Sequence, residues 1–331
     1  MKIFFYTLRE YDELAFAQKY TEETGIDFDY CTEYPSEDNY VLAKGCDAVC
    51  MTPCDMSAHM VDLFASIGIR FLLCRSIGYD HVDLAAARAH GMRVSNVSYP
   101  PSGVAHYAIM LMLMLQRQIV PILKRADVQD YSLKGKIGDD IAYQTVGVIG
   151  TGRIGQTVIR SLSGMGCRIL CYDPYQNDAV KELAEYVPLE ELYRESDVIT
   201  LHTNATEDNY HLLNREAFSA MKDGVLIVNT ARGKLIDTDA LIEALAKGKV
   251  GGAALDVLEK EDGLYYYNRM GDCIDNPDMA ILRSFPNVIM SPHTAFYTKQ
   301  AVSHMVGSCY EAARAFAEGT GTYHEVITRN A

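Results

Sequence analysis

The chain has 331 residues, which is long enough for two domains with sizeable hydrophobic cores. Hydrophobic residues make up 49% of it and charged residues 22%, proportions that are ordinary for a soluble globular protein. The formal net charge is −14 and the sequence has no basic cluster, so we expect no nucleic-acid partner.

The sequence also argues against export and membrane insertion. It begins MKIFFYTLREYDE, where a short apolar run turns acidic, unlike a signal peptide. The longest apolar patch, residues 108–115, is far shorter than the ~20 residues of a membrane span. The nine cysteines include no C-x-x-C pair. We expect them to be small buried hydrophobes in a reducing cytoplasm, with no metal site.

Strand-like and helix-like segments alternate through the first part of the chain. Strands are expected at 2–7, 28–30, 47–51, 70–74 and 93–94, with helices between them, notably at 12–24, 60–66 and 84–90. Alternating strands and helices predict a parallel sheet covered by helices on both faces. We therefore expect a small flavodoxin-like domain here.

A break follows at Ser98 to Gly103, where two prolines and a glycine cannot continue a strand or a helix interior. We interpret this segment as a crossing between domains. The helix expected at 104–117 is apolar nearly all round, so it should be buried on more than one side, at a domain or subunit interface.

The next segment, TVGVIGTGRIG at 145–155, places a G-x-G-x-x-G motif between an apolar strand and a helix. Gly150 would permit the tight turn, Gly152 would let the backbone approach a pyrophosphate, and Gly155 would let the helix pack close to the sheet. The N–H groups at the helix start, which is also where Arg153 and Ile154 lie, would then hold the phosphates.

Three features around this motif favour a dinucleotide site over an ordinary turn of an α/β protein that binds no nucleotide. A strand precedes it, a helical pattern over 154–162 follows it, and a second strand at 168–172 ends in Asp173. Asp173 lies at the distance expected of the acid that binds the adenosine ribose. A carboxylate there would repel a 2′-phosphate, so we predict NAD as the cofactor in preference to NADP.

Further strands are expected at 197–201, 225–229, 252–256 and 287–290, which makes six in this part of the chain. Six strands match the two halves of a doubly wound sheet. The helix expected at 298–317 comes after them and should pack back on the first domain. We therefore predict an α/β protein with a Rossmann NAD domain at 99–298 and a flavodoxin-like substrate domain built from 1–98 and 299–331.

Three kinds of ionisable side chain follow the strands of the Rossmann domain. Arg232 follows the strand at 225–229, two glutamates follow 252–256, and His293 follows 287–290. Because ligands bind beyond the carboxyl ends of such strands, we expect these side chains beside the dinucleotide. Each also has an ordinary explanation: a surface arginine, a solvated acidic loop, or a structural histidine. His202, after 197–201, is assigned a structural or cofactor-side role.

The chemistry that fits this set is hydride transfer to a 2-oxo acid. A histidine can supply the proton that the carbonyl oxygen needs, and a planar guanidinium can bind the substrate carboxylate through two hydrogen bonds. A glutamate hydrogen-bonded to the imidazole would favour its charged form and orient it. The nicotinamide would supply the hydride.

These residues resemble the D-2-hydroxyacid dehydrogenase family, over residues 45–300. The markers are RSIG at 75–78, TVGVIGTGRIG at 145–155, NTARG at 229–233, GGAALDVLEKE at 251–261 and SPHTA at 291–295. The FYT that follows, together with RSIGYDHVD and GGAALDVLE, is similar to the D-lactate dehydrogenase branch, including the vancomycin-resistance enzymes.

The resemblance implies roles for individual residues. Arg232 would bind the substrate carboxylate and carbonyl, His293 would be the acid/base, and Glu261, not Glu259, would be its partner. The backbone at Ile77 and Gly78 would hold the substrate carboxylate, and Tyr99 and Phe296 would line the pocket. Asp256 would hold the nicotinamide amide. The expected cofactor-binding residues are Gly150, Gly152, Arg153, Ile154, Gly155, Asp173, Thr230, Ala231, Asp256 and His293.

The resemblance further implies NADH-dependent reduction of a 2-oxo acid to the (R)-2-hydroxy acid by a homodimer, of the D-lactate or D-2-hydroxyisocaproate dehydrogenase type. Alternatives are a phosphoglycerate dehydrogenase and an NAD-sensing corepressor on the same fold. The sequence departs from the family pattern at His106, usually acidic, and at Asn204, usually proline. Thr52 replaces a larger side chain, which predicts a roomier pocket for branched or aromatic 2-oxo acids.

Overall fold

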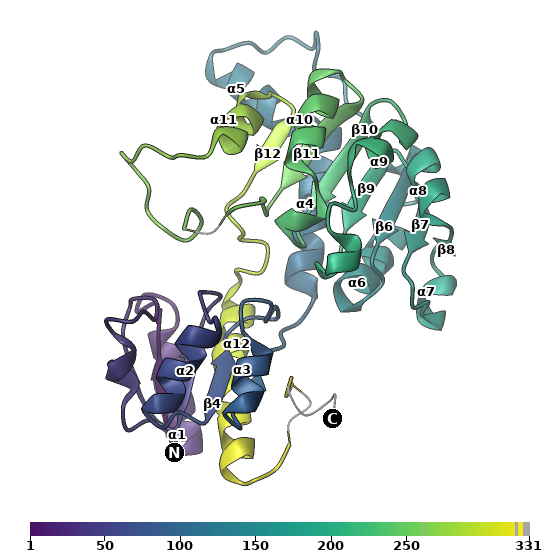
Figure 1. Cartoon of the computed structure of the whole chain (residues 1–331). Helices are drawn as coiled ribbons and strands as arrows, with labels where there is room; N and C mark the ends of the chain where they lie inside the picture. The colour runs from purple at the N-terminus through teal and green to yellow at the C-terminus, as the bar shows by residue number, and fades with distance from the viewer. Residues whose placement is uncertain (262, 322–323, 327–331) are drawn as a thin grey trace. The chain divides into compact units, whose positions relative to one another are not determined.

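The computed structural model describes residues 1–261, 263–321 and 324–326, and these form two compact units (Figure 1). The first unit comprises Met1–Pro100 and Tyr297–Ala331, and the second comprises Pro101–Phe296. The chain therefore passes between the units twice, at the two adjacent prolines and again after Phe296.

The first unit is built on a five-stranded parallel sheet in the order β2-β1-β3-β4-β5, counted over the described residues. This is the strand order of the flavodoxin-like fold, as predicted. Its strands are β1 (Lys2–Phe5), β2 (Asp27–Tyr30), β3 (Ala48–Met51), β4 (Phe71–Cys74) and β5 (Arg93–Ser95). Its helices are α1 (Leu14–Thr24), η1 (Tyr40–Ala43), α2 (Ala58–Ser66), α3 (Leu84–Ala89) and α12 (Lys299–Ala317).

The C-terminal helix α12 belongs to this first unit, where it packs against α1 and β4 (Figure 1). The ring of Tyr310 stacks 5.9 Å from that of Phe5, and its hydroxyl donates to the carbonyl of Ala17 at 3.0 Å. Further along the helix, the ring centroid of Phe316 lies 4.9 Å from that of Phe71 in β4. These buried aromatic contacts explain why the tail returns to the first sheet.

The second unit contains a parallel sheet in the order β12-β11-β10-β9-β6-β7-β8, with seven strands among the described residues. It is the doubly wound Rossmann order with one further strand, β12, at the edge. The strands are β6 (Thr145–Ile149), β7 (Arg168–Tyr172), β8 (Glu185–Tyr186), β9 (Val198–Leu201), β10 (Val225–Asn229), β11 (Val250–Leu255) and β12 (Val288–Met290). The predicted count of six was wrong because β8, at two residues, is too short to produce a hydrophobic pattern.

Helices connect these strands and cover both faces of the sheet. They are α4 (Ser102–Gln116), α5 (Ile119–Asp127), η2 (Ile141–Tyr143), α6 (Arg153–Ser163), α7 (Asp178–Lys181), α8 (Leu189–Glu195), η3 (Glu207–Asn209), α9 (Arg215–Ala220), η4 (Gly233–Leu235), α10 (Thr238–Ala246) and α11 (Pro277–Ser284). Within the described residues no single helix is long and apolar enough to cross a membrane. The pair α4 and α5 passes that test together, bent by 62° at the break.

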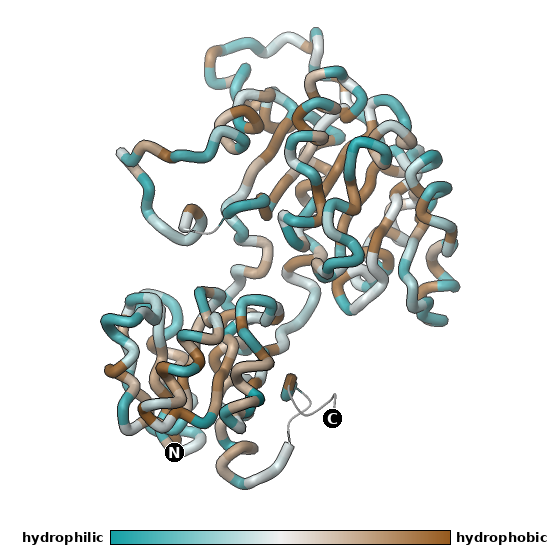
Figure 2. Tube along the Cα trace, viewed as in Figure 1, coloured by the Kyte–Doolittle hydropathy of each residue, from teal (hydrophilic) through white to brown (hydrophobic). Residues whose placement is uncertain are grey.

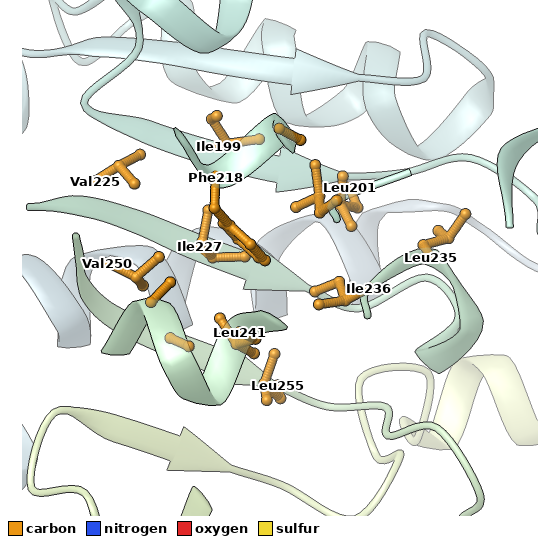
Figure 3. Close-up of a cluster of buried hydrophobic side chains, with 14 of the residues drawn as sticks. Ile199, Leu201, Phe218, Val225, Ile227, Leu235, Ile236, Leu241, Val250 and Leu255 are labelled. Carbon is orange, nitrogen blue, oxygen red and sulfur yellow. The ribbon is translucent and has the colours of Figure 1, made fainter. Parts of the chain in front are cut away.

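Buried side chains of the second sheet form a separate core on each face. In β9, Ile199 and Leu201 point into the cluster drawn in Figure 3, which also contains Phe218 of α9 and Leu241 of α10. Val198 points to the opposite face and joins the cluster of α4 and α6. Successive strand residues face opposite sides, so a strand buried on both faces is apolar along most of its length. Figure 2 shows hydrophobic residues concentrated along these strands.

Candidate active site

The glycine motif forms the connection between β6 and α6. Gly150 has a φ of +94°, and a Cβ there would lie 2.5 Å from the carbonyl oxygen of His202. A Cβ on Gly155 would lie 1.9 Å from the carbonyl oxygen of Gly150. These two glycines are thus required by the protein's own backbone.

Gly152 differs from the other two glycines of the motif. It caps the N-terminus of α6, its φ is an ordinary −66°, and a Cβ there would meet no protein atom within 4 Å. The fold itself therefore does not require glycine at this position. Open space over a helix N-terminus fits the close approach of a pyrophosphate, whose charge the N–H groups of α6 would balance.

Asp173 follows β7 and is fixed beside the glycine motif. Its Oδ2 accepts the N–H of Thr151 at 2.7 Å, and its Oδ1 accepts the N–H of Tyr175 at 2.8 Å. The hydroxyl of Tyr186, on β8, donates to Oγ1 of Thr151 at 2.7 Å. Sequence reasoning named Asp173 but not Tyr186, because a tyrosine on a two-residue strand has no motif around it.

His293 and Glu261 are in direct contact. Nδ1 of His293 lies 2.6 Å from Oε1 of Glu261, and both side chains are about three-quarters buried, with exposed fractions of 25% and 22%. The second carboxylate oxygen of Glu261 accepts the N–H of Leu258 at 2.7 Å. Because Nδ1 is engaged by the carboxylate, Nε2 is the nitrogen placed to exchange a proton with a substrate.

The backbone around His293 is held by Asp256, which follows β11 and is completely buried. The N–H of His293 donates to the carbonyl of Asp256 at 2.7 Å. The Asp256 carboxylate accepts three hydrogen bonds, from the hydroxyl of Ser291 (2.6 Å) and the N–H groups of Thr294 (2.9 Å) and Ala295 (2.8 Å). Sequence reasoning missed this loop-holding role, and the predicted contact of Asp256 with the nicotinamide amide stays a prediction.

Arg232 lies in the loop after β10, which runs against the loop that carries Glu261. Asn229 holds the Arg232 loop by donating to the carbonyl of Arg232 at 2.8 Å, and Nη1 of Arg232 donates to the carbonyl of Ala231 at 2.8 Å. A Cβ on Gly233 would lie 2.2 Å from the carbonyl carbon of Leu258. Since β10, β11 and β12 are neighbours, Arg232, Glu261 and His293 follow the carboxyl ends of three adjacent strands.

Thr230 precedes this loop and has a buried hydroxyl without a hydrogen-bond partner among the described residues. A buried polar group normally has a partner, because losing its bonds to water is costly. An unpaired hydroxyl at this edge of the sheet therefore fits a bound ligand. Together with the open space over Gly152, it is the second sign that the predicted NAD residues suit that cofactor.

Glu259 occupies a different network from Glu261. Its Oε1 accepts the hydroxyl of Tyr210 and contacts Nε2 of His211, both at 3.0 Å, and its Oε2 accepts the hydroxyl of Thr238 at 3.4 Å. Glu259 thus ties the loop after β11 to the segment that precedes α9 and to the start of α10. The structure brings Glu261, and not Glu259, to the imidazole of His293.

His202 follows β9 and pairs through Nε2 with the hydroxyl of Thr200 at 2.9 Å. Burial lowers the pKa of His202 to about 3, so the ring is neutral at physiological pH. A neutral ring packed behind the glycine motif is consistent with the structural or cofactor-side role expected from the sequence. Of the two departures from the family pattern, His106 is exposed on α4, and the backbone carbonyl of Asn204 accepts from the side chain of Asn209 at 2.7 Å.

Two aromatic rings lie against the imidazole of His293. Their centroids are 5.8 Å (Tyr266) and 6.3 Å (Phe296) from that of the imidazole, and the two rings are 6.5 Å apart at 76° to each other. Phe296 was predicted as a pocket residue, and Tyr266 was not. No sequence signal marks Tyr266, because the segment after Glu261 has neither helical nor strand periodicity.

The remaining predicted substrate residues belong to the first unit. Ile77 and Gly78 follow β4, where the side chain of Asn96 donates to the carbonyl of Ile77 at 2.7 Å and the hydroxyl of Ser76 donates to that of Gly78 at 2.5 Å. Tyr99 follows β5 and is partly buried. The turn is anchored by Arg75, which is fully buried and paired with Glu13, also fully buried, at 2.9 Å. In the same unit, the hydroxyls of Thr52 and Thr7 lie 2.7 Å apart.

A doubly wound parallel sheet with this glycine motif, and a histidine–glutamate pair at its carboxyl edge, is the design of a dinucleotide-dependent oxidoreductase. The family model described as "D-isomer specific 2-hydroxyacid dehydrogenase, NAD binding domain" matches residues 109–295. The chain therefore belongs to the D-isomer specific 2-hydroxyacid dehydrogenases, enzymes that use NAD.

Known proteins of full length resemble the chain along most of its sequence. It is 41% identical over 309 residues to an aromatic 2-oxoacid reductase of Clostridium sporogenes (92% of this chain, 93% of the relative). It is 39% identical over 321 residues to a D-lactate dehydrogenase of Lactiplantibacillus plantarum (96% and 97%). A solved structure of D-2-hydroxyisocaproate dehydrogenase superposes with a TM-score of 0.89 at 35% identity, covering 99% of this chain and all of that one.

Proposed function

We propose that this dehydrogenase reduces a 2-oxo acid with NADH to the (R)-2-hydroxy acid, and that Arg232, Glu261 and His293 carry the reaction. The observation that supports this most directly is the 2.6 Å contact between Nδ1 of His293 and Oε1 of Glu261. It stands at the edge of the sheet where dinucleotides bind in this fold, beside the loop that carries Arg232.

Each of the three side chains has a distinct task in this proposal. Glu261 orients the imidazole and stabilises its charged form, so that Nε2 of His293 can donate a proton to the substrate carbonyl oxygen. The guanidinium of Arg232 binds the substrate carboxylate and fixes the orientation of the carbonyl. NADH, when bound, supplies the hydride.

The cofactor is proposed to bind through residues of the second unit. The N–H groups at the start of α6, from Gly152 to Gly155, would hold the pyrophosphate, and Asp173 would accept the ribose hydroxyls. Thr230 and Ala231 would contact the nicotinamide half, as would Asp256. The unpartnered hydroxyl of Thr230 supports this placement.

For the substrate we propose a 2-oxo acid with a branched or aromatic side chain. Thr52 is smaller than the residue common in lactate enzymes, and its hydroxyl is turned to Thr7. Phe296, Tyr99 and the backbone of Ile77 and Gly78 are proposed to contact the substrate. The relatives' names, aromatic 2-oxoacid reductase and D-lactate dehydrogenase, describe those proteins and span both substrate sizes.

The test is the oxidation of NADH, followed by absorbance, with pyruvate, 2-oxoisocaproate and phenylpyruvate, and chiral chromatography of the products. We expect (R)-2-hydroxy acids, and a kcat/KM that is higher for the two larger substrates. His293→Gln should abolish turnover while NADH binding, measured by fluorescence, persists. His211→Gln is the matched control, because His211 also pairs with a glutamate, Glu259.

Three outcomes would contradict parts of this proposal. Turnover that survives His293→Gln would exclude the acid/base role, and (S)-products would exclude the stereochemistry. A strict preference for pyruvate would exclude the roomy pocket.

Arg232→Lys keeps the positive charge but loses the planar guanidinium, whose N–H groups can bind a carboxylate through two hydrogen bonds. This substitution should raise KM for the 2-oxo acid about 10- to 150-fold, which corresponds to the free energy of one lost charge-assisted hydrogen bond.

We also propose a homodimer formed through the second unit. The helix α5 and the segment that follows it expose a run of apolar side chains, namely Leu123, Val128, Tyr131, Leu133, Ile137 and Tyr143. Beside them, a groove of about 390 Å³ is lined by α4, α5 and the amino-terminal ends of β10 and β11. Large exposed apolar surfaces mark interfaces. In analytical ultracentrifugation the wild type should sediment as a dimer, and Leu133→Asp should sediment as a monomer.

A reducing cytoplasmic location is the last part of the proposal. All nine cysteines are free thiols, and five of them are buried. Free buried thiols are usual where the environment keeps cysteine reduced. Fractionation of the native host cell, with blotting for the protein, would test this location.

A further inference from the structure

Tyr266 contacts His293 in two separate ways. Its hydroxyl donates a hydrogen bond to the backbone carbonyl of His293 at 3.3 Å. Its ring lies against the imidazole, with centroids 5.8 Å apart and planes tilted by 36°. Tyr266 comes from the segment between Glu261 and α11, so the contact joins that segment to the loop after β12.

The hydroxyl contact matters because the backbone of His293 is in an uncommon conformation. Its φ is +54°, in the left-handed region that residues other than glycine rarely occupy. The N–H of His293 is held on one side by the carbonyls of Asp256 (2.7 Å) and Ser291 (3.0 Å). Tyr266 holds the carbonyl on the other side, so the peptide groups on both sides of this strained residue are fixed.

The ring of Tyr266 matters for substrate choice because it lies beside the imidazole that a substrate must reach. Tyr266 and Phe296 meet at 76°, an edge-to-face arrangement that aromatic pairs prefer, and both are within 6.3 Å of the imidazole centroid. A substrate whose carbonyl oxygen reaches the imidazole must place its remaining groups near this corner. A flat apolar side chain would gain contact with the two rings, whereas a methyl group would cover little of them.

We infer that Tyr266 is a positioning and specificity-determining residue: its hydroxyl fixes His293, and its ring forms with Phe296 an aromatic corner that favours 2-oxo acids with aromatic side chains. The inference rests on the proposed function of His293. It assigns the two roles to two parts of one side chain, which single substitutions can separate.

The test compares Tyr266→Phe, Tyr266→Ala and a control, Tyr267→Ala, in the full-length enzyme. Tyr267 is the next residue along, but its ring lies over the guanidinium of Arg269, 5.1 Å from the ring centroid. Steady-state kinetics with pyruvate and phenylpyruvate give kcat and KM for each variant. NADH binding, measured separately, shows that each variant is folded.

Tyr266→Phe keeps the ring, so the ratio of kcat/KM for phenylpyruvate to that for pyruvate should stay unchanged while kcat falls several-fold with both. Tyr266→Ala should in addition raise KM for phenylpyruvate more than for pyruvate. That ratio should drop about tenfold, as expected for a lost aromatic contact. Tyr267→Ala should leave the ratio and kcat at wild-type values.

An unchanged substrate ratio in Tyr266→Ala would overturn the specificity role, and an unchanged kcat in Tyr266→Phe would overturn the positioning role. If Tyr267→Ala changed the substrate ratio and kcat as much as Tyr266→Ala does, both effects would belong to the segment between Glu261 and α11 as a whole. That outcome would contradict the inference. If Tyr266→Ala does not fold, Tyr266→Leu, which keeps apolar bulk without a flat ring, carries the same comparison. A wild-type enzyme that reduces none of the 2-oxo acids would instead refute the proposed function.

Discussion

Nδ1 of His293 and Oε1 of Glu261 lie 2.6 Å apart, although 32 residues separate them in the chain. The loops that carry them follow adjacent strands, β12 and β11, so the sheet itself brings the two side chains together. The other oxygen of Glu261 is bound by the N–H of Leu258. The carboxylate therefore cannot turn away from the imidazole without losing a hydrogen bond, and the pair should behave as one unit.

The first prediction follows from this pair. Glu261→Gln keeps the shape of the side chain but removes the charge that stabilises the protonated imidazole. We expect kcat/KM for reduction to fall about 10- to 100-fold, less than the 10²–10⁴ of a whole acid/base group because His293 remains. Steady-state kinetics with NADH and a 2-oxo acid check this.

Glu259→Gln is the control for this experiment, because Glu259 is two residues away and bonds Tyr210 and His211 instead. Its kcat/KM should stay at the wild-type value. If both variants lose activity to the same degree, the charge of Glu261 has no special effect on His293.

The second prediction separates the glycines of the nucleotide loop. Gly155→Ala places a Cβ against the carbonyl oxygen of Gly150, at a distance of 1.9 Å before relaxation, and should lower the free energy of unfolding by about 1–3 kcal/mol or more. Gly152→Ala meets no protein atom, so it should unfold like the wild type. It should nevertheless weaken NADH binding about tenfold or more, which corresponds to ~1.4 kcal/mol.

Urea unfolding and NADH titration of both variants, each without substrate, measure these two effects. Tight NADH binding by Gly152→Ala would show that no phosphate approaches this glycine. The comparison is informative because the two positions lie three residues apart in one motif, yet only one of them is crowded by the fold.

Regular periodicity explains which parts of this structure were predictable. Most strands of the two sheets are buried on both faces, so their apolar runs mark them, whereas the edge strand β2 is not. The rule that ligands bind beyond carboxyl ends led to Arg232, His293 and the two glutamates after β11, and the family resemblance selected Glu261 from the two. Contacts between distant loops have no such signal. The hydrogen bond from Tyr266 to His293, and that from Tyr210 to Glu259, depend on loop conformations that no repeat in the sequence encodes.

Asp256 illustrates the same limit in another way. Its position after β11 marks it as a residue at the ligand edge of the sheet. That its carboxylate binds Ser291, Thr294 and Ala295 depends on the path of the loop after β12. The short strand β8 escaped prediction for a related reason, since two residues cannot show an alternation.

The third prediction concerns the choice between NADH and NADPH. The carboxylate of Asp173, which is proposed to accept the ribose hydroxyls, is fixed by the N–H groups of Thr151 and Tyr175. A 2′-phosphate on that ribose would be repelled by its charge. Asp173→Asn removes the charge and keeps an oxygen that can accept from Thr151. We expect the ratio of kcat/KM for NADPH to that for NADH to rise about tenfold, because repulsion between two close negative charges is lost.

Kinetics with both cofactors at fixed 2-oxo acid measure this ratio, and the effect should shrink in high salt, which screens the charges. Asp178→Asn is the control. Asp178 is the first residue of α7, five positions further along, and it pairs with Lys181. A shift of the cofactor ratio by Asp178→Asn equal to that of Asp173→Asn would contradict a local role of Asp173.

The last prediction concerns stability against acid. Burial lowers the pKa of His202 to about 3, whereas an unfolded histidine has a pKa of about 6.5. Below about pH 6.5 the unfolded chain therefore binds a proton at this residue that the folded chain does not bind. The free energy of unfolding must then fall as pH falls, by up to about 1.4 kcal/mol per pH unit, until pH approaches 3. Above pH 6.5 both states are neutral at His202 and the contribution is constant.

His202→Gln removes the titrating group and can keep a hydrogen bond to Thr200. Carboxylates also titrate in acid, so the informative quantity is the difference between the two unfolding free energies, measured in urea at a series of pH values from 7 to about 4. This difference should move in favour of the variant as pH decreases. If the two curves stay parallel over that range, the imidazole is protonated in the folded protein, and its burial behind the glycine motif does not keep it neutral.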